Sequence, residues 1–155
     1  MEPQRVGLVS DTHGLLRPEL LAALEGCTLI LHAGDVGRPE VLDGLRQVAP
    51  VVAVRGNVDR GLWAQELRPT EVAQVGQVRI YLIHDLADMA QDPLAAGFSA
   101  VVSGHSHQPG SRWVGGILYV NPGSAGPRRL KLPVSAALLH VAGGDLQVEW
   151  IKLPG

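Results

Sequence analysis

The chain has 155 residues, of which 46% are hydrophobic and 18% charged, so it can form one packed core and is not expected to be disordered. A net charge of −2 and an aromatic content of 4% argue against non-specific nucleic-acid binding and against a base-stacking surface. The single cysteine, Cys27, excludes an internal disulfide and a multi-cysteine zinc site.

We expect one domain over residues 1–155, located in the cytoplasm and not bound to a membrane. No apolar run approaches the ~20 residues that span a bilayer. The N-terminal segment, residues 1–5, has neither the basic stretch nor the long apolar run of a signal peptide.

Strands and helices alternate in the first part of the chain. Short apolar runs predict buried strands at residues 5–10, 28–33 and 51–55. Pro18 and Pro39 each stand where a first helical turn tolerates proline, and Gly26 is a plausible end for the first helix. The second helix has an apolar face formed by Val41, Leu42, Leu45 and Val48.

The pattern changes after residue 70. Residues 71–75 and 78–83 flank Gly76-Gln77, which predicts a hairpin with a two-residue turn. A helix is predicted over residues 86–96, with Pro93 as its weak point. Further strands are predicted at residues 99–103, 112–114, 117–120, 134–142 and 146–152. The alternation of strands and helices in the first part of the chain, followed by hairpins in the second part, predicts two packed sheets with helices on the outside.

Side chains of the kind that bind metals follow five of the predicted strands. They are Asp11 with His13, Asp35, Asn57, His84, and His105 with His107. Repeated units of a strand and a return connection bring the carboxyl ends of the strands to one edge, where ligand sites form in open α/β folds. Glycine stands beside nearly every one of these side chains, which lets the backbone turn sharply and approach a ligand closely. We therefore expect them to converge in one crevice.

The ligand types predict two metal ions. Imidazole, carboxylate and amide ligands without a thiolate favour manganese, iron, nickel or zinc. Seven ligands are too many for one tetrahedral ion, and Asp35 is the natural bridging carboxylate because it lies alone between the two ligand sets. Two ions ~3.5–4 Å apart can hold a hydroxide for in-line displacement at phosphorus. Such a site keeps a positive charge, which favours a phosphate substrate.

The ordered set of motifs resembles the calcineurin-like metallophosphoesterase superfamily, whose pattern is D-x-H, GD, GN, a single His and GHxH. The short length and the Asn121-Pro122-Gly123-Ser124 segment resemble its small prokaryotic phosphodiesterase branch. The resemblance runs from about Val6 to Ser124. It implies an α/β fold in which a two-sheet β-sandwich is flanked by helices.

The resemblance also implies the ligand sets and the cofactor. One ion would be held by Asp11, His13, Asp35 and His107, and the other by Asp35, Asn57, His84 and His105. The cofactor would be two divalent transition-metal ions per chain, with Mn²⁺ preferred and iron, nickel or zinc as alternatives. Asp35 and His105 are the expected catalytic residues. Asn57 and Arg128 are the expected substrate contacts, and a solvated loop pair is the competing interpretation of Arg128 and Arg129.

Two positions depart from the superfamily pattern. Many larger members follow Gly-Asn with a histidine that is thought to protonate the leaving group, whereas Asn57 is followed here by Val58-Asp59. That acid is therefore missing, and Asp59 is interpreted as a loop-capping carboxylate, with a proton relay as the alternative. His84 is followed by Asp85, where relatives often carry His-Gly-His, and this changes the wall of the pocket.

Two further histidines lie outside the motifs. His32 is interpreted as a core histidine, with a supporting role at the site as the alternative. His140 lies in a late strand and is interpreted as structural or exposed.

We therefore predict a hydrolase of small phosphate esters, specifically a phosphodiesterase in which a hydroxide bridged by two metals attacks phosphorus in line. The alternatives are a phosphomonoesterase and a non-catalytic scaffold on the same fold, as in the retromer scaffold subunit, whose metal site is degraded. The complete set of seven ligands favours the enzyme. The physiological substrate and the native metal stay open, and a homo-oligomer is compatible with the sequence.

Overall fold

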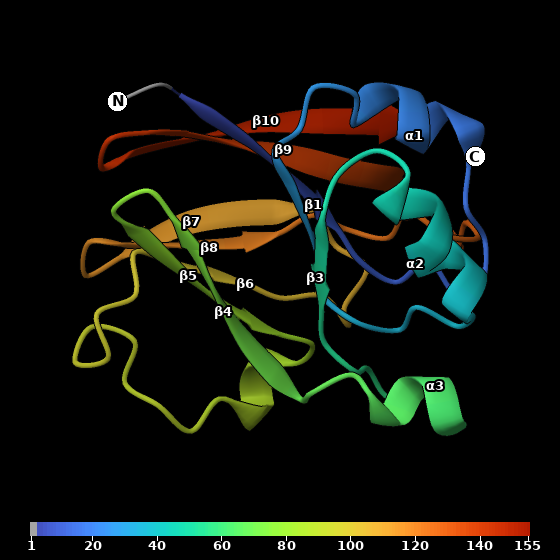
Figure 1. Ribbon diagram of the computed structural model, residues 1–155, viewed down its shortest axis with the longest axis horizontal. Helices are drawn as coiled ribbons and strands as arrows, with labels where there is room; N and C mark the ends of the chain where they lie inside the picture. The colour runs from blue at the N-terminus through green and yellow to red at the C-terminus, as the bar shows by residue number, and fades with distance from the viewer. Residues whose placement is uncertain (1–2) are drawn as a thin grey trace.

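The computed structural model describes residues 3–155, and this part of the chain forms two five-stranded sheets packed face to face (Figure 1). Residues 1–2, which belong to the segment where no signal peptide is expected, lie outside the described residues. The first sheet has the order β10-β9-β1-β2-β3 and the second the order β4-β5-β6-β8-β7. The expected α/β fold with two packed sheets is confirmed.

The first sheet has a parallel part and an antiparallel part. The parallel strands are β1 (Gln4–Val9), β2 (Leu29–His32) and β3 (Val51–Ala53). The antiparallel strands are β9 (Val134–Ala142) and β10 (Asp145–Leu153). Because β1 pairs with β2 on one side and β9 on the other, it lies in the middle of the sheet, and its last four residues are buried.

The second sheet begins with the predicted hairpin. Strands β4 (Thr70–Val75) and β5 (Val78–Ile83) are joined by Gly76-Gln77, and Gly76 has a φ of +58°, a conformation that favours glycine. Strands β6 (Ala100–Val102) and β8 (Ile117–Asn121) continue the sheet in parallel with β5. The exposed strand β7 (Gly110–Val114) pairs antiparallel with β8 and forms the edge.

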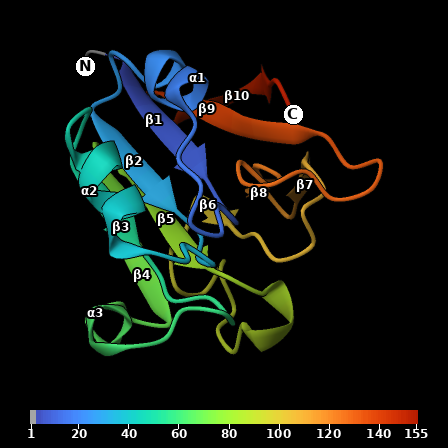
Figure 2. The same cartoon turned by 90° about the vertical axis from the view of Figure 1, so that its right-hand side faces the viewer.

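Helices α1 (Pro18–Ala23) and α2 (Pro39–Arg46) cover the outer face of the first sheet (Figure 2). Each begins at its predicted proline, because the first helical position needs no backbone N–H. Leu20 and Leu45 are fully buried in the cluster that contains Ile30 of β2. A short helix α3 (Leu62–Gln65) was not predicted. Among residues 3–155, no helix combines the length and apolarity required to traverse a bilayer.

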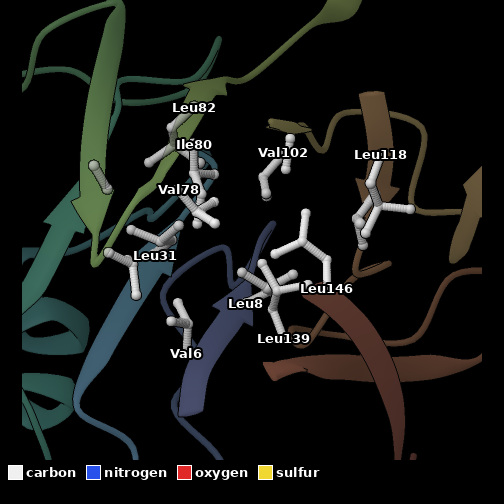
Figure 3. Close-up of a cluster of buried hydrophobic side chains, with 14 of the residues drawn as sticks. Val6, Leu8, Leu31, Val78, Ile80, Leu82, Val102, Leu118, Leu139 and Leu146 are labelled. Atoms are coloured by element: carbon white, nitrogen blue, oxygen red, sulfur yellow. The ribbon is translucent and has the colours of Figure 1, made fainter. Parts of the chain in front are cut away.

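The main core lies between the two sheets (Figure 3). Leu8 and Leu31 from the first sheet face Ile80 and Leu82 from the second, and all four side chains are fully buried. Burying apolar area contributes about 25 cal/mol per Å², so this layer fixes how the sheets stack and hence how their ends align.

The helix predicted over residues 86–96 is wrong. The segment contains only a 3-10 turn, η1 (Leu86–Asp88), followed by irregular backbone. The carboxylate of Asp85 accepts the amide of Ala87 at 3.0 Å, and that of Asp92 accepts the amide of Leu94 at 3.1 Å. Such local bonds compete with a helix, and Pro93 lacks the amide that a helix needs.

Candidate metal centre

The predicted ligands lie where the parallel strands of both sheets end. Asp11 and His13 follow β1, Asp35 follows β2, and Asn57 follows β3. In the second sheet His84 follows β5, while His105 and His107 follow β6. The two sheets thus contribute their carboxyl ends to one region, as the strand-end argument predicted.

Backbone hydrogen bonds hold the first two loops together beyond the sheet. The amide of Asp11 donates to the carbonyl of Gly34 at 3.0 Å, and that of His13 donates to the carbonyl of Asp35 at 2.9 Å. Five of the seven predicted ligands have a left-handed backbone, with φ between 47° and 74°: Asp11, His13, Asp35, His105 and His107. Such conformations cost of order 1–3 kcal/mol each and cluster at functional sites.

Two groups of side chains have the spacing of metal ligands. One consists of Asp11, His13 and His107, and the other of Asp11, Asp35 and His84, with the ligand atoms of each group within 4.8 Å of one another. Asp11 Oδ1 lies 3.3 Å from His107 Nε2 and 3.7 Å from His13 Nε2. Asp35 Oδ2 lies 3.2 Å from His84 Nε2 and 3.7 Å from His13 Nε2, so it reaches a histidine of each group.

Each carboxylate has one oxygen held by the protein and one directed at the histidines. Asp11 Oδ2 accepts the Ser10 hydroxyl at 2.6 Å and the His105 amide at 3.1 Å. Asp35 Oδ1 accepts the Val58 amide at 3.0 Å. Asp11 Oδ1 and Asp35 Oδ2 are therefore the oxygens oriented for a cation.

The hydrogen-bond inventory of the site fits a metal. Within residues 3–155, the buried side-chain atoms without a hydrogen-bond partner are Asp11 Oδ1, His13 Nε2, His84 Nε2, Arg5 Nε and Arg17 Nε. Leaving such atoms buried and unpaired costs about 1–3 kcal/mol each, so three of them converging on one region need an explanation. A divalent cation bound by these atoms would remove that cost.

His84 has the tautomer that a metal ligand needs. Its Nδ1 lies 2.7 Å from the carbonyl oxygen of Ala33, and since a carbonyl only accepts, Nδ1 carries the proton. The lone pair of Nε2 then faces Asp35 Oδ2 at 3.2 Å, and two acceptors at this distance require a proton or a metal between them. A backbone carbonyl that fixes the tautomer is a usual companion of metal-binding histidines.

The two carboxylates are ionised despite their burial. Burial opposes the ionisation of Asp11, but His13 and Ser10, together with the charges of His84 and His107, hold its pKa below the usual value. Burial also opposes the ionisation of Asp35 by raising its pKa. The hydrogen bonds from His84 and the Val58 amide outweigh this effect, so the pKa of Asp35 is lowered below its usual value.

The pKa values of His84 and His107 are shifted in opposite directions by their surroundings. Burial lowers the pKa of His84, but Asp35 outweighs this and raises it. Burial lowers the pKa of His107, as does the charge of Arg129, against the opposing effect of Asp11.

Asn57 and His105 lie at the rim of the groups rather than inside them. Asn57 is exposed and lines a cleft of about 210 Å³ together with His84. His105 packs edge-on against His84, with ring centroids 5.2 Å apart, and its Nε2 lies 3.7 Å from Asp85 Oδ2. Within the described chain, His105 belongs to neither group of closely spaced ligand atoms.

The two arginines proposed as a substrate contact differ in position. The side chain of Arg128 lies beside Gly155 near the C-terminal end. Arg129 is the arginine whose charge acts on His107. Both are exposed.

A chain of hydrogen bonds that the motifs did not reveal supports the loops. The Gly34 amide donates to His32 Nδ1 at 3.1 Å, so Nε2 carries the proton and donates to Thr12 Oγ1 at 3.0 Å. Thr12 in turn donates to the carbonyl of Val36 at 2.9 Å. His32 is fully buried in the core, as expected, and it also supports the site, which was the alternative interpretation.

Asp59 caps two loops, as predicted. Its Oδ1 accepts the Gly37 amide at 2.9 Å and its Oδ2 accepts the Gly56 amide at 2.8 Å. It therefore connects the loop that carries Asp35 with the loop that carries Asn57. Since both oxygens are occupied, Asp59 is placed as a structural carboxylate rather than a proton donor.

The segment after β8 also joins the site, and its role could not be assigned from sequence. Asn121 Nδ2 donates to the carbonyl of Gly104 at 2.9 Å and to Ser106 Oγ at 3.1 Å, on either side of His105. Ser124 Oγ donates to the carbonyl of Asp11 at 2.9 Å. His140, by contrast, pairs with Glu149 at 2.9 Å on the surface, in agreement with its structural interpretation.

Comparison with known proteins identifies the family. The family model of the calcineurin-like phosphoesterase superfamily domain matches residues 5–144. A probable metallophosphoesterase from Methanothermobacter thermautotrophicus is 35% identical, over 95% of this chain and 91% of that protein.

Solved structures share the fold at lower sequence identity. A structure described as a novel archaeal phosphodiesterase has a TM-score of 0.79 at 17% identity, and covers 96% of this chain and 100% of its own. The Entamoeba histolytica Vps29 protein complexed with Zn²⁺ has a TM-score of 0.72 at 24% identity, and covers 96% of this chain and 99% of its own.

Proposed function

Because the chain belongs to the calcineurin-like phosphoesterase superfamily, we propose that it is a binuclear metal-dependent phosphodiesterase. The observation that carries the proposal is the convergence of buried, unpartnered ligand atoms from both sheets on two ionised aspartates. A structural neighbour described as a phosphodiesterase supports the choice of diester over monoester.

The proposed ligands follow the geometry. Asp11, His13 and His107 would hold one ion, and His84 with Asn57 and His105 would hold the second. Asp35 would join the two, because its Oδ2 faces His13 and His84. When bound, the two divalent ions, with Mn²⁺ preferred and iron, nickel or zinc as alternatives, would lower the pKa of a shared water and neutralise charge on the phosphate.

The protein's own residues position the substrate and the ions. Ser10 and the His105 amide orient Asp11, while the Val58 amide orients Asp35, so neither carboxylate must reorganise during the reaction. Arg129 adds positive charge beside His107, and we include it with Asn57 and Arg128 as a contact for the substrate phosphate.

Asp59 is not expected to act as the proton donor for the leaving group in the proposed enzyme. Asp59, which follows the Gly-Asn motif, has both oxygens occupied by backbone amides. Esters of good leaving groups, which depart without protonation, are therefore the substrates for a first assay. A small phosphate ester is the proposed partner, with no membrane involved.

The test is the substitution Asp35→Asn in metal-supplemented bis(p-nitrophenyl) phosphate hydrolysis. Removing the shared carboxylate charge should weaken metal binding and reduce the rate by at least about 10²-fold, the usual loss when one preorganised electrostatic element is removed. His140→Ala is the matched control, because His140 only pairs with Glu149 on the surface, and it should leave the rate nearly unchanged. A folded, fully active Asp35→Asn variant would reject the proposed site.

The second candidate is a scaffold on the same fold, which the Vps29 structures among the neighbours favour. The same experiment separates the two. A folded wild-type protein that hydrolyses no phosphate ester with any divalent metal would favour the scaffold.

A further inference from the structure

A cleft of about 540 Å³ adjoins the candidate metal centre at His105. Its walls come from the η1 loop, from the loop after β6, and from β7 and β8. Its polar lining residues include Asp85, His105, Gln108, Arg112, Tyr119 and Asn121. The volume lies within the range of small-molecule sites, which is about 300–1,000 Å³. The metal centre accounts for only one end of this cleft.

Arg112 brings an uncompensated charge into the cleft. Within residues 3–155 its guanidinium forms no ion pair and no hydrogen bond to another side chain. It lies 5.6 Å above the ring of Tyr119, and the β7–β8 register places the two residues directly opposite each other. A guanidinium stacked on a ring keeps its N–H edges free for a carboxylate or a phosphate.

The register also places Arg112 close to the loop of His105. Tyr119 precedes Asn121 by two residues on β8, which corresponds to about 7 Å along an extended strand. Asn121 bonds to the backbone of Gly104 and the side chain of Ser106, on either side of His105. The Arg112–Tyr119 pair is therefore two strand residues away from the contact with the loop of His105, a span that a short organic group can bridge.

The cleft also contains a negatively charged side chain, Asp85, which lies beside His105. Asp85 Oδ1 accepts the Ala87 amide at 3.0 Å, and Asp85 Oδ2 faces His105 Nε2 at 3.7 Å. Since Asp85 is engaged by the Ala87 amide and lies beside His105, Arg112 is the charged side chain of the cleft that is left without an ion pair among residues 3–155.

We propose that this cleft binds the organic substituent of the phosphodiester that is not the leaving group. Arg112 selects substituents that carry an anionic group. The proposal rests on the phosphodiesterase function proposed above. It names a substrate class, which is phosphodiesters with a second negative charge one short chain away from phosphorus.

The test compares two p-nitrophenyl phosphodiesters with the same leaving group, one with a butyl arm and one with a 3-carboxypropyl arm. Wild type should show a kcat/KM about 5- to 20-fold higher for the carboxylated arm, the range expected for a charged hydrogen bond in a partly exposed cleft. Arg112→Gln should remove this preference and leave kcat/KM for the butyl ester within about 2-fold. Arg46→Gln, on the surface of α2, is the charge-matched control and should keep the preference.

A binding measurement separates the subsite from catalysis. Calorimetric titration of Mn²⁺-loaded protein with butylphosphonate and 4-phosphonobutyrate, which are not hydrolysed, should show tighter binding of the carboxylated compound to wild type but not to Arg112→Gln. If no ester is hydrolysed but this difference is found, the subsite stands and the phosphodiesterase function fails.

Two outcomes would overturn the proposed subsite. In the first, both esters are hydrolysed, so the phosphodiesterase function stands, but wild type shows no preference for the carboxylated arm. The same conclusion follows if that preference persists in Arg112→Gln. The second is a preference for a neutral aromatic arm that Arg112→Gln removes, because it would make Arg112 a stacking group rather than an anion receptor.

Discussion

His32 connects two ligand loops through a neutral imidazole. Its Nδ1 accepts the Gly34 amide, and its Nε2–H donates to Thr12, the residue between Asp11 and His13. Protonation at Nδ1 would break the bond to Gly34, and burial lowers the pKa of His32 to about 4 against the opposing charges of Asp11 and Asp59. The unfolded chain, in contrast, takes up this proton near the ordinary histidine value of about 6.5.

This difference predicts a stability loss in acid. The contribution of His32 is complete above about pH 6.5 and is lost as the pH falls toward 4, because the unfolded state binds the proton first. The loss should be on the order of 3 kcal/mol in the free energy of unfolding. Urea unfolding of the chelator-treated protein between pH 4 and 7 measures it, and His32→Gln should show a correspondingly flatter pH dependence. Equal slopes for the two proteins would mean that His32 does not titrate in this way.

At the scale of the elements, the loop after β6 and the loop after β1 make close contact at Gly104. A Cβ atom at this position would meet the hydroxyl of Ser10 and the Oδ2 of Asp11. Since these groups orient Asp11, the close approach of the two loops and the orientation of the ligand depend on the same glycine.

Gly104→Ala should therefore affect both stability and metal binding. Forcing the loops apart should cost about 1–3 kcal/mol of unfolding free energy, the range for overpacking, and should weaken Mn²⁺ binding because Asp11 is displaced. Gly144→Ala is the control, since a Cβ at Gly144 meets nothing within 4 Å. Urea unfolding with and without Mn²⁺ measures both effects, and a Gly104→Ala protein that matches the control would contradict the role of this contact.

The helices and strands that could be predicted from sequence are those whose formation depends on residues close together in the chain. Apolar runs and N-terminal prolines predicted the strands and helices of the first sheet, because burial and proline geometry act within a few residues. The helix predicted over residues 86–96 was wrong because Asp85 and Asp92 accept hydrogen bonds from nearby amides. The pattern of apolar residues does not reveal such bonds.

The same distinction applies to the site. Strand-end positions predicted that the two aspartates would meet His13, His84 and His107, because parallel strands align their ends. The contacts of His32, Asn121 and Ser124 span many residues and join separate loops, so no local pattern signalled them. The cleft at Arg112 was missed because it depends on how β7 pairs with β8.

At the scale of the whole molecule, the candidate metal centre joins the two sheets. Asp11 and Asp35 belong to loops of the first sheet, whereas His84 and His107 belong to loops of the second. In the protein itself, the His105 amide donates to Asp11 and His84 Nδ1 donates to Ala33, and both bonds cross between the sheets. A bound cation would add further connections at the same end of the molecule.

Metal binding should therefore stabilise the entire fold rather than one loop. A ligand that binds only the folded state at 100 times its Kd adds about 2.7 kcal/mol, and for a chain of this length each kcal/mol raises Tm by about 2–4 °C. Mn²⁺ at that excess should raise Tm by about 5–11 °C relative to chelator-treated protein, as measured by calorimetry. Asp35→Asn should reduce the increase, while His140→Ala should retain it because His140 lies outside the centre. An equal increase in Asp35→Asn would place the stabilising ion elsewhere, and an unchanged Tm at that excess would mean that Mn²⁺ does not bind the folded state in preference to the unfolded state.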